Sequence, residues 1–213
     1  MTVAIRSLPC LNSMSLIFNK DTREYIAPSG AVIPSVTTII RSSELFYGFH
    51  NQTDNTKRDR GIELHEALFN SHHYKGLFAQ SIPDSEVGWY IRKWLEIQEV
   101  EGIVPLEGEK IVGSEELGHA GRLDLRALVK GKKALLDFKT GKSMDNTYTA
   151  IQLSGYAIAE GDIEEIYGLC IHPEVNKKGY RLKLLPDMRE VFEDLKREYY
   201  LRDRIFDIGD MPF

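Results

Sequence analysis

The sequence predicts an α/β fold whose core is a mixed β-sheet, and two observations lead to this prediction. Apolar residues recur at helical spacing on both sides of the central region, which is typical of amphipathic helices packed on a sheet. The centre itself, residues 109–140, changes to short apolar runs separated by glycine-bearing turns, which indicates antiparallel strands. The predicted order is helix, three strands, helix and strand, preceded by a helix-rich N-terminal attachment. The chain has 213 residues, 42% apolar and 28% charged, which favours one globular domain.

The N-terminal attachment combines a hairpin with helices. Residues 15–33 contain apolar runs around two turn signals, which predicts a small hairpin. Ser35 follows a proline and can cap a short helix over residues 35–43. Residues 60–73 and 84–99 then carry apolar residues about one helical turn apart, and the second of these helices begins at a polar pair, either member of which can cap it.

The remaining predicted elements form the sheet and the helices that follow it. They are strands over residues 109–116, 121–129 and 133–140, a helix over 146–161, strands over 164–173 and 179–185, and a last helix that starts at Asp187. Gly161 is suited to end the first of these helices, because glycine adopts a left-handed conformation without a steric penalty. Glu190 stands three residues after Asp187, which predicts a capping box.

Charge is distributed unevenly along the chain. The total is −5, but the window from Gly118 to Lys142 holds seven basic and two acidic side chains, so this window is +5 and the rest is −10. A local basic field can attract a polyanion, although an exposed hairpin tip can also be basic without a function. The two cysteines lie far apart and match neither a disulfide framework nor a metal knuckle, which favours a reducing setting. No apolar run has the length of a membrane span, so no membrane partner is expected.

Polar residues interrupt the first long strand of the centre. In residues 121–129 the alternation of a strand places Leu123, Leu125 and Ala127 on one face. Asp124 and Arg126 share the opposite face. An aspartate and an arginine in this position can form an ordinary surface ion pair, and such pairs are common and weak.

A second aspartate suggests a different use of these carboxylates. Asp137 and Lys139 are two residues apart in the next strand and therefore share a face. If the two strands pair through the basic turn between them, Asp124 and Asp137 can lie close together at the open end. Two close, desolvated carboxylates repel each other, and a hard divalent cation such as Mg²⁺ resolves the conflict. The pattern therefore favours a metal site over two separate ion pairs.

These residues carry a resemblance to a known family. The series "GRLD", "LLDFKTG" and "QLSGYA", at residues 121–124, 135–141 and 152–157, resembles the active-site motifs of the PD-(D/E)xK nuclease superfamily, in its RecB-like exonuclease branch. Upstream, "RGIELHEAL" at 60–68 is similar to an R-G-x-x-x-H helix of that branch. "IPSVTTII" at 33–40 is similar to the entry segment of nucleases carried by phages and other mobile elements. The resemblance covers most of the chain and implies a restriction-endonuclease-like core.

The resemblance implies a role for each residue that matches a motif. The catalytic residues it implies are Asp124, Asp137, Lys139, Gln152 and Tyr156. The implied ligands of one or two Mg²⁺ or Mn²⁺ ions are His65, Asp124, Asp137 and the carbonyl of Phe138, with Glu109 or Glu115 as a candidate additional carboxylate. The candidate contacts to the nucleic acid are Arg58, Arg60, Arg122, Thr140 and Lys142.

The function that the resemblance implies is a metal-dependent deoxyribonuclease, and more narrowly an exonuclease, in the cytoplasm of a bacterial or phage-infected cell. Its partner is DNA, with a single-strand-annealing or recombination protein as a further candidate. One nuclease domain is expected over residues 1–213, with an attachment over 1–56, a catalytic core over 57–185 and a C-terminal helix over 186–213. Relatives that hold an iron–sulfur cluster use four cysteines, so none is expected with two.

Two alternatives stay open at this stage. One is a catalytically inactive module that binds DNA or a protein on the same fold, and the other is a nuclease that acts on RNA. The intact set of two aspartates and a lysine speaks against the first, because a binding module does not need it. The oligomeric state is not indicated by the sequence.

Overall fold

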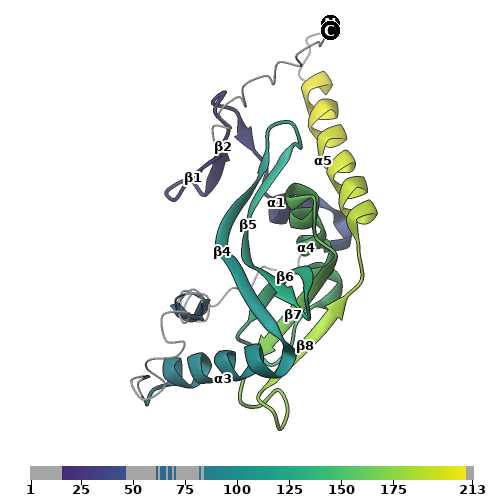
Figure 1. Ribbon diagram of the computed structural model, residues 1–213. Helices are drawn as coiled ribbons and strands as arrows, with labels where there is room; N and C mark the ends of the chain where they lie inside the picture. Colours follow the sequence, from purple (N-terminus) through teal and green to yellow (C-terminus); the bar gives the residue numbers. More distant parts are fainter. Residues whose placement is uncertain are drawn as a thin grey trace, which may run out of the picture.

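The computed structural model describes residues 16–46 and 84–209, the side chains of 203–209 excepted, together with residues 61, 63–65, 67, 68, 70 and 82. Within this part of the chain a five-stranded sheet forms the centre of the molecule (Figure 1). Its strands are β4 (Ile103–Ser114), β5 (His119–Val129), β6 (Lys132–Lys139), β7 (Glu165–Ile171) and β8 (Tyr180–Leu185), hydrogen-bonded in that order.

The sheet is mixed, as the sequence predicts. All neighbouring strands are antiparallel except β6 and β7, which are parallel. A parallel pair needs a crossover, and helix α4 (Asn146–Glu160) supplies it between these two strands. Asp145 caps α4, since its carboxylate accepts a hydrogen bond from the N–H of Tyr148, and Gly161 ends the helix with φ of 79°.

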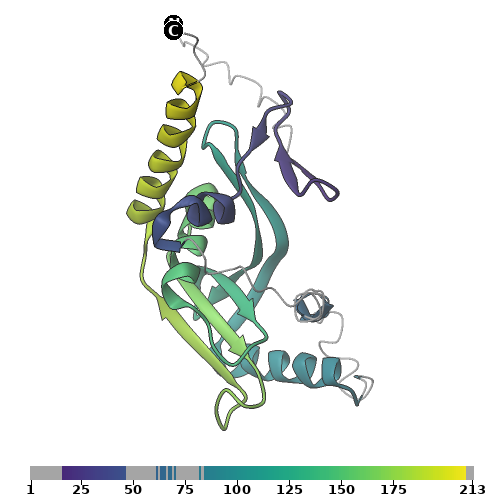
Figure 2. The ribbon, with the colours of Figure 1, turned by 180° about the vertical axis from the view of Figure 1, so that it is seen from behind.

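Helices cover both faces of the sheet (Figures 1 and 2). Helices α1 (Val36–Ser42), α4 and α5 (Arg189–Gly209) lie on one face, where residues such as Ile39, Leu153 and Phe192 form a buried apolar cluster. Helix α3 (Glu86–Glu101) covers the other face and packs with helical residues of the 61–70 segment. Ser85 is the residue that caps α3. Two buried layers therefore hold the sheet in place from both sides.

A smaller sheet is attached at the N-terminal side. It consists of β1 (Ile17–Asn19), β2 (Glu24–Ile26) and β3 (Val32–Ile33), and a 3₁₀ turn, η1 (Glu44–Phe46), follows α1. The hairpin predicted over residues 15–33 is thus present, extended by a third short strand. Ala120 joins the two sheets, because its N–H donates to the carbonyl of Pro34 over 3.0 Å.

Several predicted boundaries shift in the structure, and two of the shifts have a clear cause. β4 starts at Ile103 and not at residue 109, because the pairing with β5 continues past a register shift between Pro105 and Glu107. The last helix begins at Arg189, and the first helical hydrogen bond runs from Phe192 to the carbonyl of Met188. The capping box at Asp187 is therefore absent, since Asp187 precedes the cap position.

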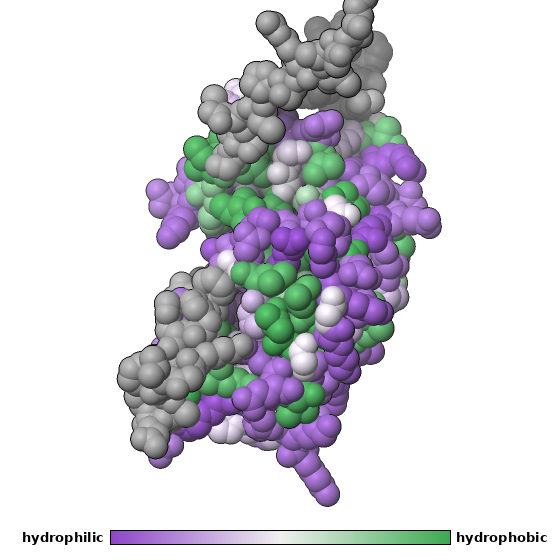
Figure 3. Space-filling view, viewed as in Figure 1, coloured by the Kyte–Doolittle hydropathy of each residue, from purple (hydrophilic) through white to green (hydrophobic). Residues whose placement is uncertain are grey.

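The described helices are all too short or too polar to cross a bilayer. On the face shown in Figure 3, hydrophilic residues form a band across the middle, and apolar residues gather over β4. Val104 and Leu106 of that strand are about half exposed, at 53% and 48%.

Candidate metal centre

A break in the pleat of β4 and β5 creates the site. Gly108 pairs with Leu125 and Lys110 pairs with Leu123, so Glu109 lies opposite Asp124. Glu109 has a φ of 51°, in the left-handed region that strands avoid. At this point the buried side chains of β5 pass from one face of the sheet to the other.

The change of face corrects one prediction. Leu125 and Ala127 pack in the cluster under α3, but Leu123 belongs to the cluster under α4. Strict alternation predicted that the three residues share one face. The structure shows that they do not. The pleat is broken at Glu109 and Asp124. Their side chains therefore point into the region where the buried residues of β5 pass from one face of the sheet to the other.

Strands β5 and β6 separate at the same level. Their paired register ends at Leu125 and Leu136. Beyond it, the backbone N–H of Phe138 donates to Asp124 Oδ2 over 2.8 Å, so a side-chain carboxylate takes the place of a strand carbonyl. This bond fixes the orientation of Asp124, which is 20% exposed at its side chain.

His65 comes from the helical segment on the α3 side. Leu64 and Leu68 of this segment are buried at 1% exposure each, which anchors it to the sheet. His65 Nδ1 then lies 3.6 Å from Asp124 Oδ2, and its ring packs edge-on against Phe138 with 5.9 Å between centroids.

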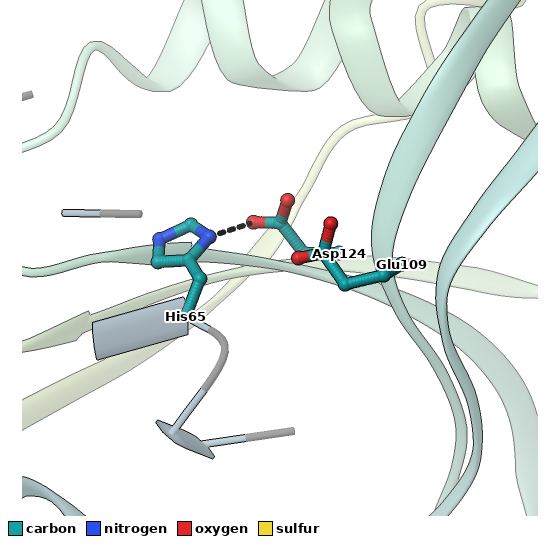
Figure 4. A group of neighbouring side chains, drawn as sticks. All are labelled: His65, Glu109 and Asp124. Atoms are coloured by element: carbon teal, nitrogen blue, oxygen red, sulfur yellow. Dashed lines mark ion pairs between the residues drawn. The ribbon is translucent and has the colours of Figure 1, made fainter. Parts of the chain in front are cut away.

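His65, Glu109 and Asp124 together form a group that could hold a metal ion. One ligand atom from each lies within 4.8 Å of the others. Figure 4 shows the imidazole facing the Asp124 carboxylate, with the Glu109 carboxylate beside it. Of the two glutamates left open by the sequence, Glu109 is the one in this group. Glu115 instead accepts a hydrogen bond from the Ser29 hydroxyl over 2.6 Å.

Asp137 and Lys139 form the adjacent part of the site. Asp137 is 4% exposed, and Lys139 Nζ lies 2.9 Å from its Oδ1 and 2.7 Å from its Oδ2. Only the contact to Oδ1 has hydrogen-bond geometry, and within the described structure the buried Oδ2 accepts no hydrogen bond. The Lys139 ammonium already offsets the charge of Asp137, and Oδ2 can still accept a contact from water or an ion.

The charges of these four side chains depend on one another. Burial alone would raise the pKa of Asp124, but the hydrogen bond and charge of His65, with help from Lys139, hold it below the usual value. Burial raises the pKa of Asp137, against the attraction of Lys139. Burial lowers the pKa of Lys139 and of His65, but the neighbouring aspartates outweigh it and raise both. Lys139 is therefore an ammonium group at neutral pH in this arrangement.

Helix α4 contributes two further predicted residues. Gln152 Nε2 donates to the Tyr156 hydroxyl over 3.1 Å, as their spacing of one helical turn allows. Tyr156 is 5% exposed, and burial raises its pKa, so the hydroxyl stays neutral. Gln152 Oε1 is buried and accepts no hydrogen bond from any described residue. Tyr156 also lines the cavity beside the metal group.

Two cavities meet at His65. The larger has a volume of about 730 Å³ and is bordered by β5, α1 and the small sheet. The smaller, of about 410 Å³, is bordered by Lys139 and the residues after β6. His65 lines both, whereas Glu109 and Asp124 line only the larger one, so the candidate metal centre lies in the wall of the larger cavity.

The predicted nucleic-acid contacts are placed unevenly. Arg122 lines the larger cavity, with its Nε 3.1 Å from Glu109 Oε2, and Thr140 lines the smaller one. Lys142 is exposed and forms an ion pair with Glu174. Arg58 and Arg60 lie outside the described residues.

The larger cavity also contains residues that sequence reasoning did not select. They are Phe18, Arg23, Tyr25, Ser35, Thr37, Thr38 and Arg41. Ser35, Thr37 and Thr38 stand in the segment "IPSVTTII", which could have drawn attention to them. The others give no signal in the sequence, since their position depends on how the small sheet packs on β5.

No protein-family model and no curated protein matches this chain. The fold and the site by themselves define an α/β protein with a central mixed sheet and an acidic-histidine group that could hold a metal ion.

Proposed function

We propose that the chain is a Mg²⁺- or Mn²⁺-dependent nuclease of the PD-(D/E)xK superfamily, in its RecB-like branch, that hydrolyses phosphodiester bonds of DNA. One observation carries the proposal. His65, Glu109 and Asp124 converge from a helix and two strands, next to the buried pair of Asp137 and Lys139. Motif residues separated by more than seventy positions in the chain thus meet at one place.

The donor set fits the implied ion. Carboxylate oxygens suit Mg²⁺ and Mn²⁺, and an imidazole is compatible with Mn²⁺. His65, Glu109 and Asp124 are the residues that would hold it, and Asp137, whose Oδ2 lies 2.7 Å from Lys139 Nζ, stands beside them as a further candidate. When bound, such an ion lowers the pKa of a coordinated water and neutralises charge that develops on the phosphate.

The protein's own groups account for the remaining requirements. The Lys139 ammonium is held beside Asp137, so it can donate a hydrogen bond and offset negative charge on a nearby phosphate. The proposed role of Lys139 is to position the attacking water and to stabilise charge on the phosphate. Phe138 keeps Asp124 in orientation through its N–H, and Tyr156 remains a neutral hydroxyl able to donate.

The test is cleavage of end-labelled linear DNA and closed circular DNA by the purified protein. Each substrate is incubated with Mg²⁺, with Mn²⁺ and with EDTA, for wild type and for Lys139→Ala. Lys132→Ala is the matched control, because Lys132 lies in the same strand but pairs with Glu165 at the exposed end. We expect metal-dependent cleavage in wild type and the control, and its loss in Lys139→Ala with an unchanged circular dichroism spectrum.

The outcomes separate the alternatives. Shortening of linear DNA alone identifies an exonuclease, and cutting of the circle identifies an endonuclease with the same site. Preference for an RNA substrate would overturn the assignment to DNA. A folded protein that cleaves neither substrate with either ion would contradict the proposal and favour a binding module.

A further inference from the structure

The larger cavity contains more than the candidate metal centre requires. Its other walls are the β1–β2 hairpin, helix α1 and the outer part of β5. These elements contribute Phe18, Arg23, Tyr25, Thr38, Arg41 and Arg122. None of these side chains belongs to the metal group itself, so the cavity offers further polar and aromatic groups to a ligand beside the ion.

The charge of the lining favours an anion. Arg23, Arg41 and Arg122 line the cavity together with the carboxylates of Glu109 and Asp124. The three guanidinium groups outnumber the two carboxylates, and a divalent ion at those carboxylates makes the balance more positive. The chain as a whole is −5, so this cavity contrasts with the average surface.

The size of the cavity indicates which part of a nucleic acid it can enclose. A volume of 730 Å³ equals a cube with an edge of about 9 Å, within the range of sites for small ligands. The major groove of B-DNA alone is about 12 Å wide, so a duplex cannot be enclosed in this volume. An unpaired strand of one or two nucleotides is of suitable size.

Aromatic and guanidinium surfaces are available for an unpaired base. Phe18 is half-buried, its ring centroid lies 4.9 Å from that of Tyr25, and Arg122 Cζ lies 5.8 Å from the Phe18 centroid. Proteins that hold single strands combine such stacking surfaces with cationic groups that follow the backbone. Glu109 also holds Arg122, so the stacking surface is connected directly to the metal group.

We propose that this cavity binds unpaired nucleotides of a DNA strand next to the scissile phosphate. Phe18 and Arg122 provide the surface on which a base stacks, and Arg23 and Arg41 neutralise the adjoining phosphates. The inference rests on the proposed nuclease function for its placement of the scissile bond. It makes the substrate a single strand or a frayed end, and it gives the N-terminal sheet a role in substrate binding.

The test measures binding and does not depend on cleavage. Lys139→Ala protein is titrated in Mg²⁺ against a fluorescein-labelled single-stranded oligonucleotide and a blunt hairpin duplex of equal nucleotide number, with fluorescence anisotropy as the readout. We expect the single strand to bind at least about tenfold more tightly. Phe18→Leu keeps an apolar side chain but removes the ring, and it should weaken single-strand binding at least about fivefold. Phe18→Trp should restore it.

Salt dependence tests the contribution of charge. Arg23→Gln should reduce the slope of log affinity against log salt by about 0.7, the value for one phosphate contact on a single strand. Lys177→Gln removes one positive charge from the β7–β8 turn, which Figure 1 draws at the opposite end of the molecule from the β1–β2 hairpin, and it should leave the slope unchanged.

The outcomes distinguish this inference from the nuclease proposal. Equal or tighter binding of the blunt duplex, or unchanged affinity in a folded Phe18→Leu variant, would overturn the inference while wild-type cleavage could still be observed. Single-strand binding that depends on Phe18, in a wild-type protein that cleaves nothing, would support the cavity assignment and contradict the nuclease. Tighter binding of a single RNA strand than of DNA would overturn the choice of DNA.

Discussion

Gly121 in β5 is a position where one methyl group should disturb the site. A Cβ at Gly121 would lie 2.3 Å from Tyr156 Cε1 and 3.2 Å from Cδ1 and Cζ of the same ring. Carbon atoms in contact prefer separations of about 3.5–4.0 Å, so in Gly121→Ala the ring must move by about 1 Å or more. Tyr156 is 5% exposed and hydrogen-bonded to Gln152, which leaves it little room to move.

Overpacking of this kind costs about 1–3 kcal/mol. In a domain of this size each kcal/mol lowers the melting temperature by about 2–4 °C, so Gly121→Ala should melt roughly 2–12 °C below wild type. Thermal unfolding followed by circular dichroism measures the shift. Gly168→Ala is an instructive control: its Cβ would lie 2.2 Å from Met144 Cε, but a flexible thioether end can rotate away, so the loss should be smaller.

A double-mutant cycle tests the physical reason. In a Tyr156→Ala background the obstructing ring is gone, so adding Gly121→Ala should cost little further stability. If Gly121→Ala lowers the unfolding free energy equally in both backgrounds, collision with the ring is not the cause and the reasoning is refuted.

Three further predictions concern acid, metal and a partly buried ion pair. Burial lowers the pKa of His119 below 6.5, so the unfolded chain binds more protons than the folded protein as pH falls below 6.5, and the free energy of unfolding should decrease there. Urea unfolding at several pH values should show a smaller decrease for His119→Gln than for wild type. An equal decrease in the two proteins would contradict this reasoning. Mn²⁺ at about a hundred times its Kd should stabilise the protein by about 2.7 kcal/mol, which is measured as a rise in melting temperature. The same Mn²⁺ concentration should raise the melting temperature of Glu109→Gln less. An identical rise in both proteins would exclude Glu109 as a ligand. The side chain of Glu160 is 6% exposed, with Oε1 3.0 Å from Lys110 Nζ and Oε2 3.3 Å from Arg126 Nε. Glu160→Gln should lower the free energy of unfolding, measured by chemical denaturation, by about 1.5–3 kcal/mol. A loss of less than about 0.5 kcal/mol would indicate a solvated pair.

The sequence predicted the sheet because its strands follow the alternation that burial imposes. It also predicted His65 and Asp124 as neighbours, but only through the resemblance of their motifs, since the two residues are far apart in the chain. The carboxylate of Asp137 was expected in the same metal group. The structure places it beside that group, in a buried ion pair with Lys139, and adds Glu109 to His65 and Asp124, so its role as a ligand stays a prediction.

Other parts of the site depend on features that no local pattern records. Glu109 could not be preferred over Glu115, because the choice follows from the register of β4 on β5 and from the left-handed backbone at Glu109. The early start of β4 was missed because Pro105 and a register shift interrupt its alternation. Phe18 and Arg23 reach the cavity only because the small sheet docks through Ala120, a tertiary contact.

The irregular course of β4 also bears on how the protein avoids aggregation. β4 is an end strand of the five-stranded sheet, and an end strand offers a row of unpaired backbone groups to which another chain can add. Pro105 lacks an N–H, the register shifts before Glu107, and the backbone turns left-handed at Glu109, so this row is interrupted. Straightening β4 would therefore remove a carboxylate from the metal group and, at the same time, expose a continuous edge to other copies of the chain.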